Sequence, residues 1–258
     1  MIGVFDSGVG GLGVLAQIRR VLPEADLIYL ADQARAPYGV RTLDEVAGMS
    51  GQISSWLMER GASTITIACN TASAAALHRL RSLHPDVPFV GMEPAVKPAA
   101  LTTSTGVIGV LATAATFQGE LFASVVQRHA EGLQVLTRAC PDWVDLVESG
   151  VSGGPEAQRR VERCLRPLLE AGVDTLVLGC THFPFLTQVI ETVAGPDIGI
   201  VDPAPAVARQ VGRVADTPRE SGQLLLATSG DPVRFEQLAH DLAGIETDQP
   251  VLACSWND

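Results

Sequence analysis

Two cysteines stand at the ends of two segments that share one pattern. Residues 61–71 read Gly-Ala-Ser-Thr-Ile-Thr-Ile-Ala-Cys-Asn-Thr, and residues 172–182 read Gly-Val-Asp-Thr-Leu-Val-Leu-Gly-Cys-Thr-His. In both, a glycine lies eight residues before the cysteine, a threonine lies five before it, and an apolar run typical of a buried strand fills the interval. The pattern predicts two equivalent strands that deliver Cys69 and Cys180 to one cleft. Two-base proton transfer requires this arrangement.

The segments that follow Cys69 and Cys180 favour the start of a helix. A helix N-terminus lowers the pKa of a thiol, so we expect a shift from about 8.5 to about 7 at both cysteines, which corresponds to about 2 kcal/mol. His182 lies two residues after Cys180, where it could tune that thiol or protonate a group on a substrate. The alternative is a pair of buried structural cysteines beside a structural histidine.

The other three cysteines, Cys140, Cys164 and Cys254, are expected to be free and buried. An odd number of cysteines without any C-x-x-C spacing argues against a disulfide framework and against a structural zinc site. Lys97 is the only lysine in the chain, and we read its proline-flanked segment as a solvent-exposed loop. A pyridoxal phosphate enzyme anchors its cofactor on a lysine. We therefore expect neither a metal nor a cofactor.

Residues 8–13, Gly-Val-Gly-Gly-Leu-Gly, fit the G-x-G-x-x-G pattern after a predicted strand, and Asp32 closes the next strand where a ribose-binding acid would stand. A nucleotide-binding module is therefore one hypothesis. However, Asp6 lies between the strand and the first glycine, and its carboxylate would repel a pyrophosphate. The same loop suits a zwitterionic amino acid, with its ammonium near Asp6 and a carboxylate near backbone N–H groups.

Composition and charge narrow the class of protein. The chain has 258 residues and a formal net charge of −11, which disfavours nucleic acid and anionic membranes as partners. No apolar run approaches the length of a membrane span, and the first residues read as a strand without a basic region before it. We expect a cytoplasmic protein with a small-molecule substrate.

Predicted strands and helices alternate along the chain, which indicates an α/β fold with parallel sheets. We expect two pseudo-symmetric lobes, each a mostly parallel sheet flanked by helices, with the active site in the cleft between them. One lobe is predicted to comprise residues 1–95 and, after the chain returns, 207–258; the other comprises 96–206. Thr42 and Glu45 are spaced as a capping box at the start of a helix that runs to about residue 60. Residues 217–222 read as a linker.

Five segments together resemble the glutamate racemase family. They are residues 6–12 (Asp-Ser-Gly-Val-Gly-Gly-Leu), 36–39 (Ala-Pro-Tyr-Gly), 68–73 (Ala-Cys-Asn-Thr-Ala-Ser), 179–184 (Gly-Cys-Thr-His-Phe-Pro) and 228–231 (Thr-Ser-Gly-Asp). The resemblance runs nearly end to end. It implies a cofactor-independent isomerase that interconverts L- and D-glutamate, the D isomer being used in peptidoglycan, and it leaves a homodimer open. The alternative within the superfamily is a racemase for aspartate or another amino acid.

The resemblance also implies roles for individual residues. Cys69 and Cys180 would be the two acid/base residues, Asp6 and His182 would assist them, and Glu148 corresponds to an acid that the family keeps. The implied substrate-binding residues are Asp6, Ser7, Pro37, Tyr38, Gly39, Asn70, Thr71, Thr113, Thr116, Thr181 and His182.

Overall fold

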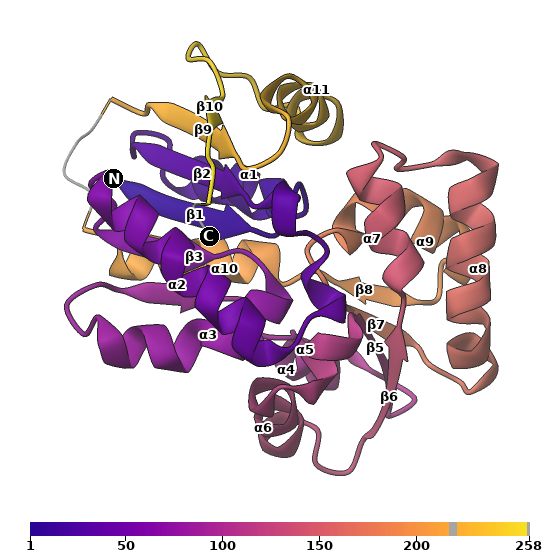
Figure 1. The fold of residues 1–258 in the computed structure, drawn as a ribbon. Helices are drawn as coiled ribbons and strands as arrows, with labels where there is room; N and C mark the ends of the chain where they lie inside the picture. Colours follow the sequence, from indigo (N-terminus) through magenta and orange to yellow (C-terminus); the bar gives the residue numbers. More distant parts are fainter. Residues whose placement is uncertain (217–220, 257–258) are drawn as a thin grey trace.

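The computed structural model describes residues 1–216 and 221–256, and its strands form two parallel sheets (Figure 1). The six-stranded sheet has the order β10-β9-β2-β1-β3-β4, and the four-stranded sheet has the order β6-β5-β7-β8. We call each sheet with the helices that cover it the first and the second lobe. The first sheet contains β1 (Ile2–Asp6), β2 (Leu27–Ala31), β3 (Thr64–Ile67), β4 (Phe89–Gly91), β9 (Leu224–Thr228) and β10 (Leu252–Ala253). The second contains β5 (Val107–Ala112), β6 (Gln134–Ala139), β7 (Thr175–Gly179) and β8 (Gly199–Val201).

The two sheets repeat one topology. The run β2-β1-β3-β4 in the first sheet corresponds to β6-β5-β7-β8 in the second, and all neighbouring strands are parallel. Cys69 follows β3 and Cys180 follows β7, so the cysteines occupy equivalent positions. The first sheet is extended by β9, which pairs with β2, and by β10. The predicted α/β fold with two pseudo-symmetric lobes is therefore confirmed, whereas the residue bounds of the lobes stay a prediction.

Helices cover both faces of each sheet. Those packed on the first sheet are α1 (Leu12–Val21), α2 (Leu43–Glu59), α3 (Asn70–Leu83), α10 (Ala204–Val214) and α11 (Pro232–Ala243). Those of the second lobe are α4 (Val96–Thr102), α5 (Ala114–Gln118), α6 (Glu120–His129), α7 (Pro141–Glu148), α8 (Gly154–Glu170) and α9 (Thr187–Ala194). The predicted capping box is present at the start of α2: Thr42 accepts from the Glu45 amide, and the Glu45 carboxylate accepts from the Thr42 amide.

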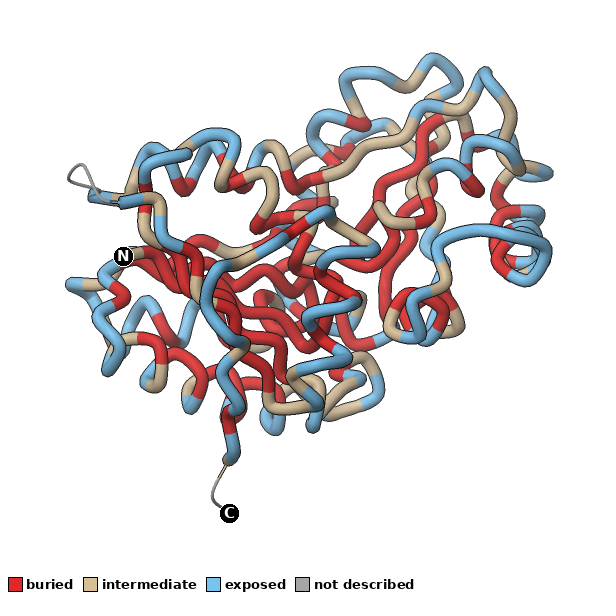
Figure 2. Tube along the Cα trace, turned by 90° about the horizontal axis from the view of Figure 1, so that it is seen from above, coloured by how far each residue is buried: buried red, intermediate tan, exposed pale blue. Residues whose placement is uncertain are grey.

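One hydrophobic core spans both lobes. It joins residues of the first lobe, such as Leu15 of α1 and Tyr29 of β2, to residues of α7, β7 and the segment after it, such as Trp143 and Phe183. The rings of Trp143 and Phe183 meet edge to face at 4.8 Å. Figure 2 shows the buried residues concentrated along the strands and the exposed ones on the outer turns. This shared core fixes the carboxyl ends of the two sheets relative to each other.

Two expectations about local structure need correction or restriction. Lys97 was predicted to lie in a loop, but it is an exposed residue of α4. Pro98 is compatible with this helix because it falls in the first turn, where the missing N–H of proline costs no intrahelical hydrogen bond. Of the predicted linker 217–222, residues 217–220 lie outside the described residues. Within the described ranges, no helix combines the length and the apolar character needed to cross a bilayer.

The expectation that all five cysteines are free was wrong. Cys140 and Cys164 form a disulfide bond, and Cys69, Cys180 and Cys254 are free and buried. Cys140 caps the N-terminus of α7, and Cys164 lies on the buried face of α8, which packs against α7. The sequence could not show this pairing, because the two cysteines lie 24 positions apart and the segment between them carries no disulfide motif.

We predict that thiol titration of the denatured, unreduced protein counts only the three free cysteines, and that reduction raises the count to five. Cys140→Ser should raise the unreduced count by one because it releases Cys164, whereas Cys254→Ser should lower it by one. An unreduced count of five in freshly purified protein would contradict the disulfide.

Candidate active site

A pocket of about 240 Å³ lies at the carboxyl ends of the strands, between the two lobes. Parallel sheets present ligand sites at this edge because the loops after the strands converge there. Eleven of the residues that sequence reasoning named for the site line it: Ser7, Pro37, Tyr38, Gly39, Cys69, Asn70, Thr71, Thr113, Cys180, Thr181 and His182. The structure thus brings both cysteines to one cavity, each from a different lobe.

Three of the named residues stand behind the pocket wall. Asp6 is fully buried, and its Oδ2 accepts a hydrogen bond from Thr181 Oγ1 at 3.0 Å. Glu148 lies behind His182 at the end of α7. Thr116 lies within hydrogen-bond distance of both Thr71 and Thr113. These residues contact the lining side chains rather than the cavity itself.

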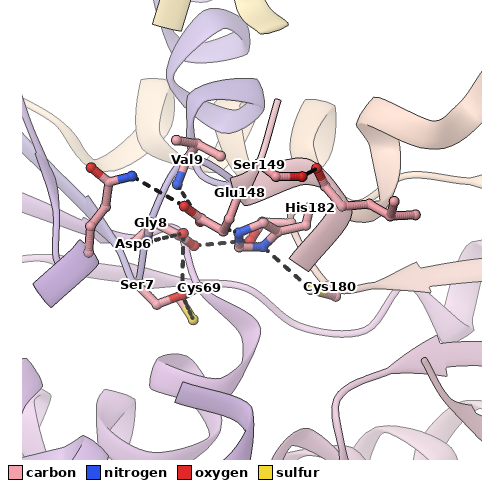
Figure 3. Close-up of polar contacts among 12 residues, drawn as sticks. Asp6, Ser7, Gly8, Val9, Cys69, Glu148, Ser149, Cys180 and His182 are labelled. Atoms are coloured by element: carbon pink, nitrogen blue, oxygen red, sulfur yellow. Dashed lines mark hydrogen bonds and ion pairs between the residues drawn. The ribbon is translucent and has the colours of Figure 1, made fainter. Parts of the chain in front are cut away.

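Cys180 is the first member of a hydrogen-bonded chain that ends at a carboxylate. Its Sγ lies 3.7 Å from Nδ1 of His182, and Nε2 of His182 lies 2.6 Å from Oε1 of Glu148 (Figure 3). Glu148 Oε1 also accepts from the Val9 amide at 2.8 Å, which ties this chain to the first lobe. A histidine held between a thiol and a carboxylate is oriented for proton transfer to or from the sulfur.

The electrostatics of this chain favour an imidazolium paired with a carboxylate. Burial acts to lower the pKa of His182, but its hydrogen bonds to Cys180 and Glu148 outweigh burial and raise that pKa well above the ordinary value. Burial acts to raise the pKa of Glu148, and the hydrogen bond and charge of His182 reverse this and lower it. These contacts favour a protonated His182 that is hydrogen-bonded to Glu148, next to the Cys180 sulfur.

Cys69 is supported by a different chain of contacts. Its Sγ lies 3.9 Å from Ser7 Oγ, which in turn lies 3.5 Å from Oδ1 of Asp6 (Figure 3). Asp6 Oδ1 also accepts from the Gly8 amide at 2.9 Å. Cys69 is thus connected to the Asp6 carboxylate through the Ser7 hydroxyl, whereas Cys180 is connected to the Glu148 carboxylate through a histidine.

The expectation of a lowered pKa was wrong for Cys69. Burial raises the pKa of this thiol far above its ordinary value, and the negative charge of Asp6 adds to the effect. Cys69 does cap the N-terminus of α3, as predicted, and the Ala72 amide acts in the expected direction. Desolvation is the larger effect, so burial favours the neutral form of the Cys69 thiol. Cys180 precedes a short 3₁₀ helix, Phe183–Leu186, rather than an α-helix.

The glycines of the loop after β1 allow Glu148 and His182 to pack against the backbone, and this accounts for them without a bound phosphate. A β-carbon at position 8 would overlap the Glu148 carboxylate, and one at position 10 would overlap the His182 ring. Side chains at either position would therefore push the Glu148 and His182 pair away from the first lobe. The space that a pyrophosphate would need beside Gly8 and Gly10 holds these two side chains instead.

Asp32, considered above as a ribose-binding acid, is fully engaged by the protein. Its Oδ1 accepts from Ser229 Oγ and from the Trp256 indole at 2.8 and 2.7 Å. Its Oδ2 accepts from the hydroxyl of Tyr38 and from Arg35 Nε. The guanidinium of Arg35 also stacks on the Trp256 ring, 4.2 Å from its centre. Asp32 thus holds the loop that carries Tyr38 into the pocket.

Asn70 gives the pocket a buried polar side chain whose hydrogen bonds are not satisfied by the described residues. Both side-chain polar atoms of Asn70 are buried without a hydrogen-bond partner among the described residues. The hydroxyls of Thr71, Thr113 and Thr116 lie within 2.9 to 3.3 Å of one another. An unpaired buried amide is costly unless a ligand satisfies it, so Asn70 identifies this wall of the pocket as a binding surface for a small polar molecule.

Sequence reasoning missed part of the wall. The remaining lining residues are Val40, Ala114, Ala139, Pro141, Val144 and Asp145. Ala139 ends β6, so the rule that ligands meet strand ends could have found it. Asp145 lies three residues before Glu148 on α7, and this spacing places both on one helix face.

Comparisons with known proteins agree with this geometry. The family model described as Asp/Glu/Hydantoin racemase matches residues 12–211. A protein of Roseiflexus sp. named glutamate racemase is 49% identical over 248 residues, which covers 93% of this chain and 91% of that protein. A crystal structure of glutamate racemase from Bacillus anthracis superposes with a TM-score of 0.89 at 31% identity, covering 99% of this chain and 97% of that one.

A second solved structure, Escherichia coli glutamate racemase in complex with L-glutamate and an activator, superposes with a TM-score of 0.88 at 31% identity. It covers 98% of this chain, and this chain covers 97% of it. The relatives and structures thus agree over nearly the full length, and the family model agrees over residues 12–211. The chain belongs to the Asp/Glu/hydantoin racemase family.

Proposed function

We propose that this protein interconverts L- and D-glutamate by moving the α-proton between two thiols. The observation that carries the proposal is that Cys69 and Cys180 line one small pocket from opposite lobes, each backed by contacts that end at a carboxylate. Support for glutamate as the substrate comes from the relatives of similar length that bear this name. The product would supply D-glutamate for peptidoglycan, and a cytoplasmic location stays a prediction.

In one direction Cys180, as thiolate beside the protonated His182, removes the α-proton from one face of the substrate. The neutral Cys69 thiol then donates its own proton to the opposite face of the α-carbon. Each step breaks one bond to hydrogen and forms another, so two thiols balance the reaction without a cofactor. In the reverse direction the roles exchange, as microscopic reversibility requires.

Binding of the substrate is assigned to neutral donors. Asn70 and the hydroxyls of Thr71 and Thr113 line the pocket, and α3 begins at Asn70 without a side-chain cap for its first amides. Neither arginine nor lysine is found among the described residues that line this pocket. Preorganised N–H and O–H donors would therefore hold the carboxylates and stabilise charge that develops at the α-carbon.

The first prediction concerns solvent hydrogen. Purified protein incubated with D-glutamate in deuterated water, without added cofactor, should form L-glutamate that carries deuterium at the α-carbon, because the donating thiol exchanges with solvent. Chiral chromatography with mass spectrometry at low conversion measures both isomers, and the recovered D-glutamate should stay unlabelled. Racemisation without label in the product would exclude the two-thiol mechanism. Turnover of D-aspartate but not of D-glutamate would refute the substrate assignment.

The second prediction concerns the thiols. Cys69→Ser and Cys180→Ser should each lower kcat by at least about a hundredfold, since each removes an acid/base group, while circular dichroism shows an intact fold. Cys254→Ser is the matched control: that thiol is also free and buried but does not line the pocket. It should stay within about twofold of the unmodified protein. Near-full activity in either of the first two variants would make that cysteine structural.

The third prediction concerns pH. Burial raises the pKa of Asp6 to about 6. The carboxylate that supports Ser7 and Thr181 is thus present above this pH and lost below it, so kcat/KM should fall as the pH drops through about 6. Free glutamate does not titrate there, because its side-chain carboxyl has a pKa of about 4.3. Asp6→Asn should lower kcat/KM and remove this decline. A decline that persists in Asp6→Asn would assign it to another group.

A further inference from the structure

Gln33 makes a contact with the Cys180 side of the site that its position in the sequence does not suggest. It lies in the loop after β2, in the short 3₁₀ helix Gln33–Arg35, and does not line the pocket. Its Nε2 donates to Oε2 of Glu148 at 3.2 Å, across the boundary between the lobes. The two residues are 115 positions apart in the chain.

This contact completes the hydrogen bonding of the Glu148 carboxylate. Oε1 accepts from His182 and from the Val9 amide, so one oxygen serves both the histidine and the first lobe. Within the described part of the chain, the side chain of Gln33 is the partner of Oε2. Rotation of the carboxylate about its Cγ–Cδ bond moves both oxygens, so a contact at Oε2 resists this rotation in addition to the two contacts at Oε1. The contact with Gln33 fixes its plane and thereby the direction of its bond to His182.

The orientation of the Gln33 amide is itself determined by the protein. A carboxylate only accepts hydrogen bonds, so Nε2 must face Glu148 and Oε1 must face away. Oε1 lies 2.9 Å from the hydroxyl of Thr228, at the end of β9, which donates to it and shares its proton with the Ala31 carbonyl at 3.1 Å. A β-carbon at Gly230 would lie 2.9 Å from that of Gln33, so the loop after β9 packs tightly against this residue. Gln33 is therefore held from both ends.

The outer side of the Glu148 carboxylate faces a second cavity. This cavity, of about 340 Å³, is lined by Gln33, Glu148, Gly230 and Arg234 among others. The Glu148 side chain remains 21% exposed. Without the Gln33 amide, water in this cavity would bind Oε2 instead. Water can change its position, whereas the amide is held in place by the protein.

We propose that Gln33 is a positioning residue that fixes Glu148, and through it His182, for proton transfer at Cys180. The inference rests on the proposed function for its catalytic consequence, whereas its structural part concerns the Glu148 and His182 pair alone. The lobe that carries Cys69 thereby controls the general acid/base chain of the other cysteine, through Thr228, Gln33 and Glu148.

The kinetic test uses Gln33→Ala in the full-length protein. A hydrogen bond to a charged group corresponds to about tenfold in rate or more, so kcat should fall about tenfold while KM stays within about twofold, because Gln33 does not line the pocket. In a Glu148→Ala background, which removes the acceptor that Gln33 contacts, the same substitution should change kcat by less than about twofold. Full additivity of the two substitutions, or an unchanged kcat in Gln33→Ala, would overturn the proposal.

Gln52→Ala is the matched control. Gln52 accepts a hydrogen bond from Arg35, so this variant removes one contact of the same loop and leaves the Glu148 contact in place. It should keep kcat within about twofold. An equal loss in Gln52→Ala and Gln33→Ala would assign the effect to loosening of the loop and contradict the proposal.

A readout independent of activity separates this proposal from the proposed function. The imidazole resonances of His182, assigned by comparison with His182→Asn, report its pKa by NMR titration. The groups that face this ring are Cys180 and Glu148, with Asp6 nearby. A less well fixed Glu148 should lower the pKa of His182 in Gln33→Ala but not in Gln52→Ala. An identical His182 titration in Gln33→Ala would refute the positioning role, even if the protein racemised another amino acid or none.

Discussion

The hydrogen bond between His182 and Glu148 is the constraint around which the site is arranged. Both residues belong to the second lobe, and the bond can form at 2.6 Å only because the first lobe has no side chains at Gly8 and Gly10. Any side chain at these positions would occupy the volume of the carboxylate or of the ring. The glycines of the first loop therefore serve the acid/base chain of the opposite lobe. This explains a glycine-rich turn after β1 without a phosphate.

The two halves share a topology but support their thiols by different chemistry. Cys180 is followed by Thr181 and His182, whereas Cys69 is followed by Asn70 and Thr71 and relies on Ser7 and Asp6 from a neighbouring strand. The two enantiomers of an amino acid have equal free energy in water, so the ratio of kcat/KM in the two directions must equal one. Unequal support for the two thiols can therefore alter kcat and KM separately in each direction but never that ratio.

The sequence was sufficient for the fold and for the convergence of the two cysteines because these follow from local patterns, whereas most of the other residues of the pocket wall were implied by the family resemblance. Duplicated apolar strands that end in cysteine predict the paired sheets, and the ends of parallel strands predict where Ser7, Asn70 and Thr181 gather. The disulfide between Cys140 and Cys164 and the contact between Gln33 and Glu148 depend on helices and loops that meet only after folding. The spacing of residues along the chain does not predict such long-range contacts.

The pKa of Cys69 is a second property that local sequence patterns did not predict. The sequence places this thiol correctly at a helix N-terminus, where oriented amides favour the thiolate. The degree of burial is a property of the whole cleft, and here both lobes and the carboxylate of Asp6 surround the sulfur. Removing water from an ion costs several kcal/mol, whereas a helix terminus contributes about 2 kcal/mol at most. Desolvation therefore decides the protonation state of Cys69, and a neutral thiol is the form that a proton donor needs.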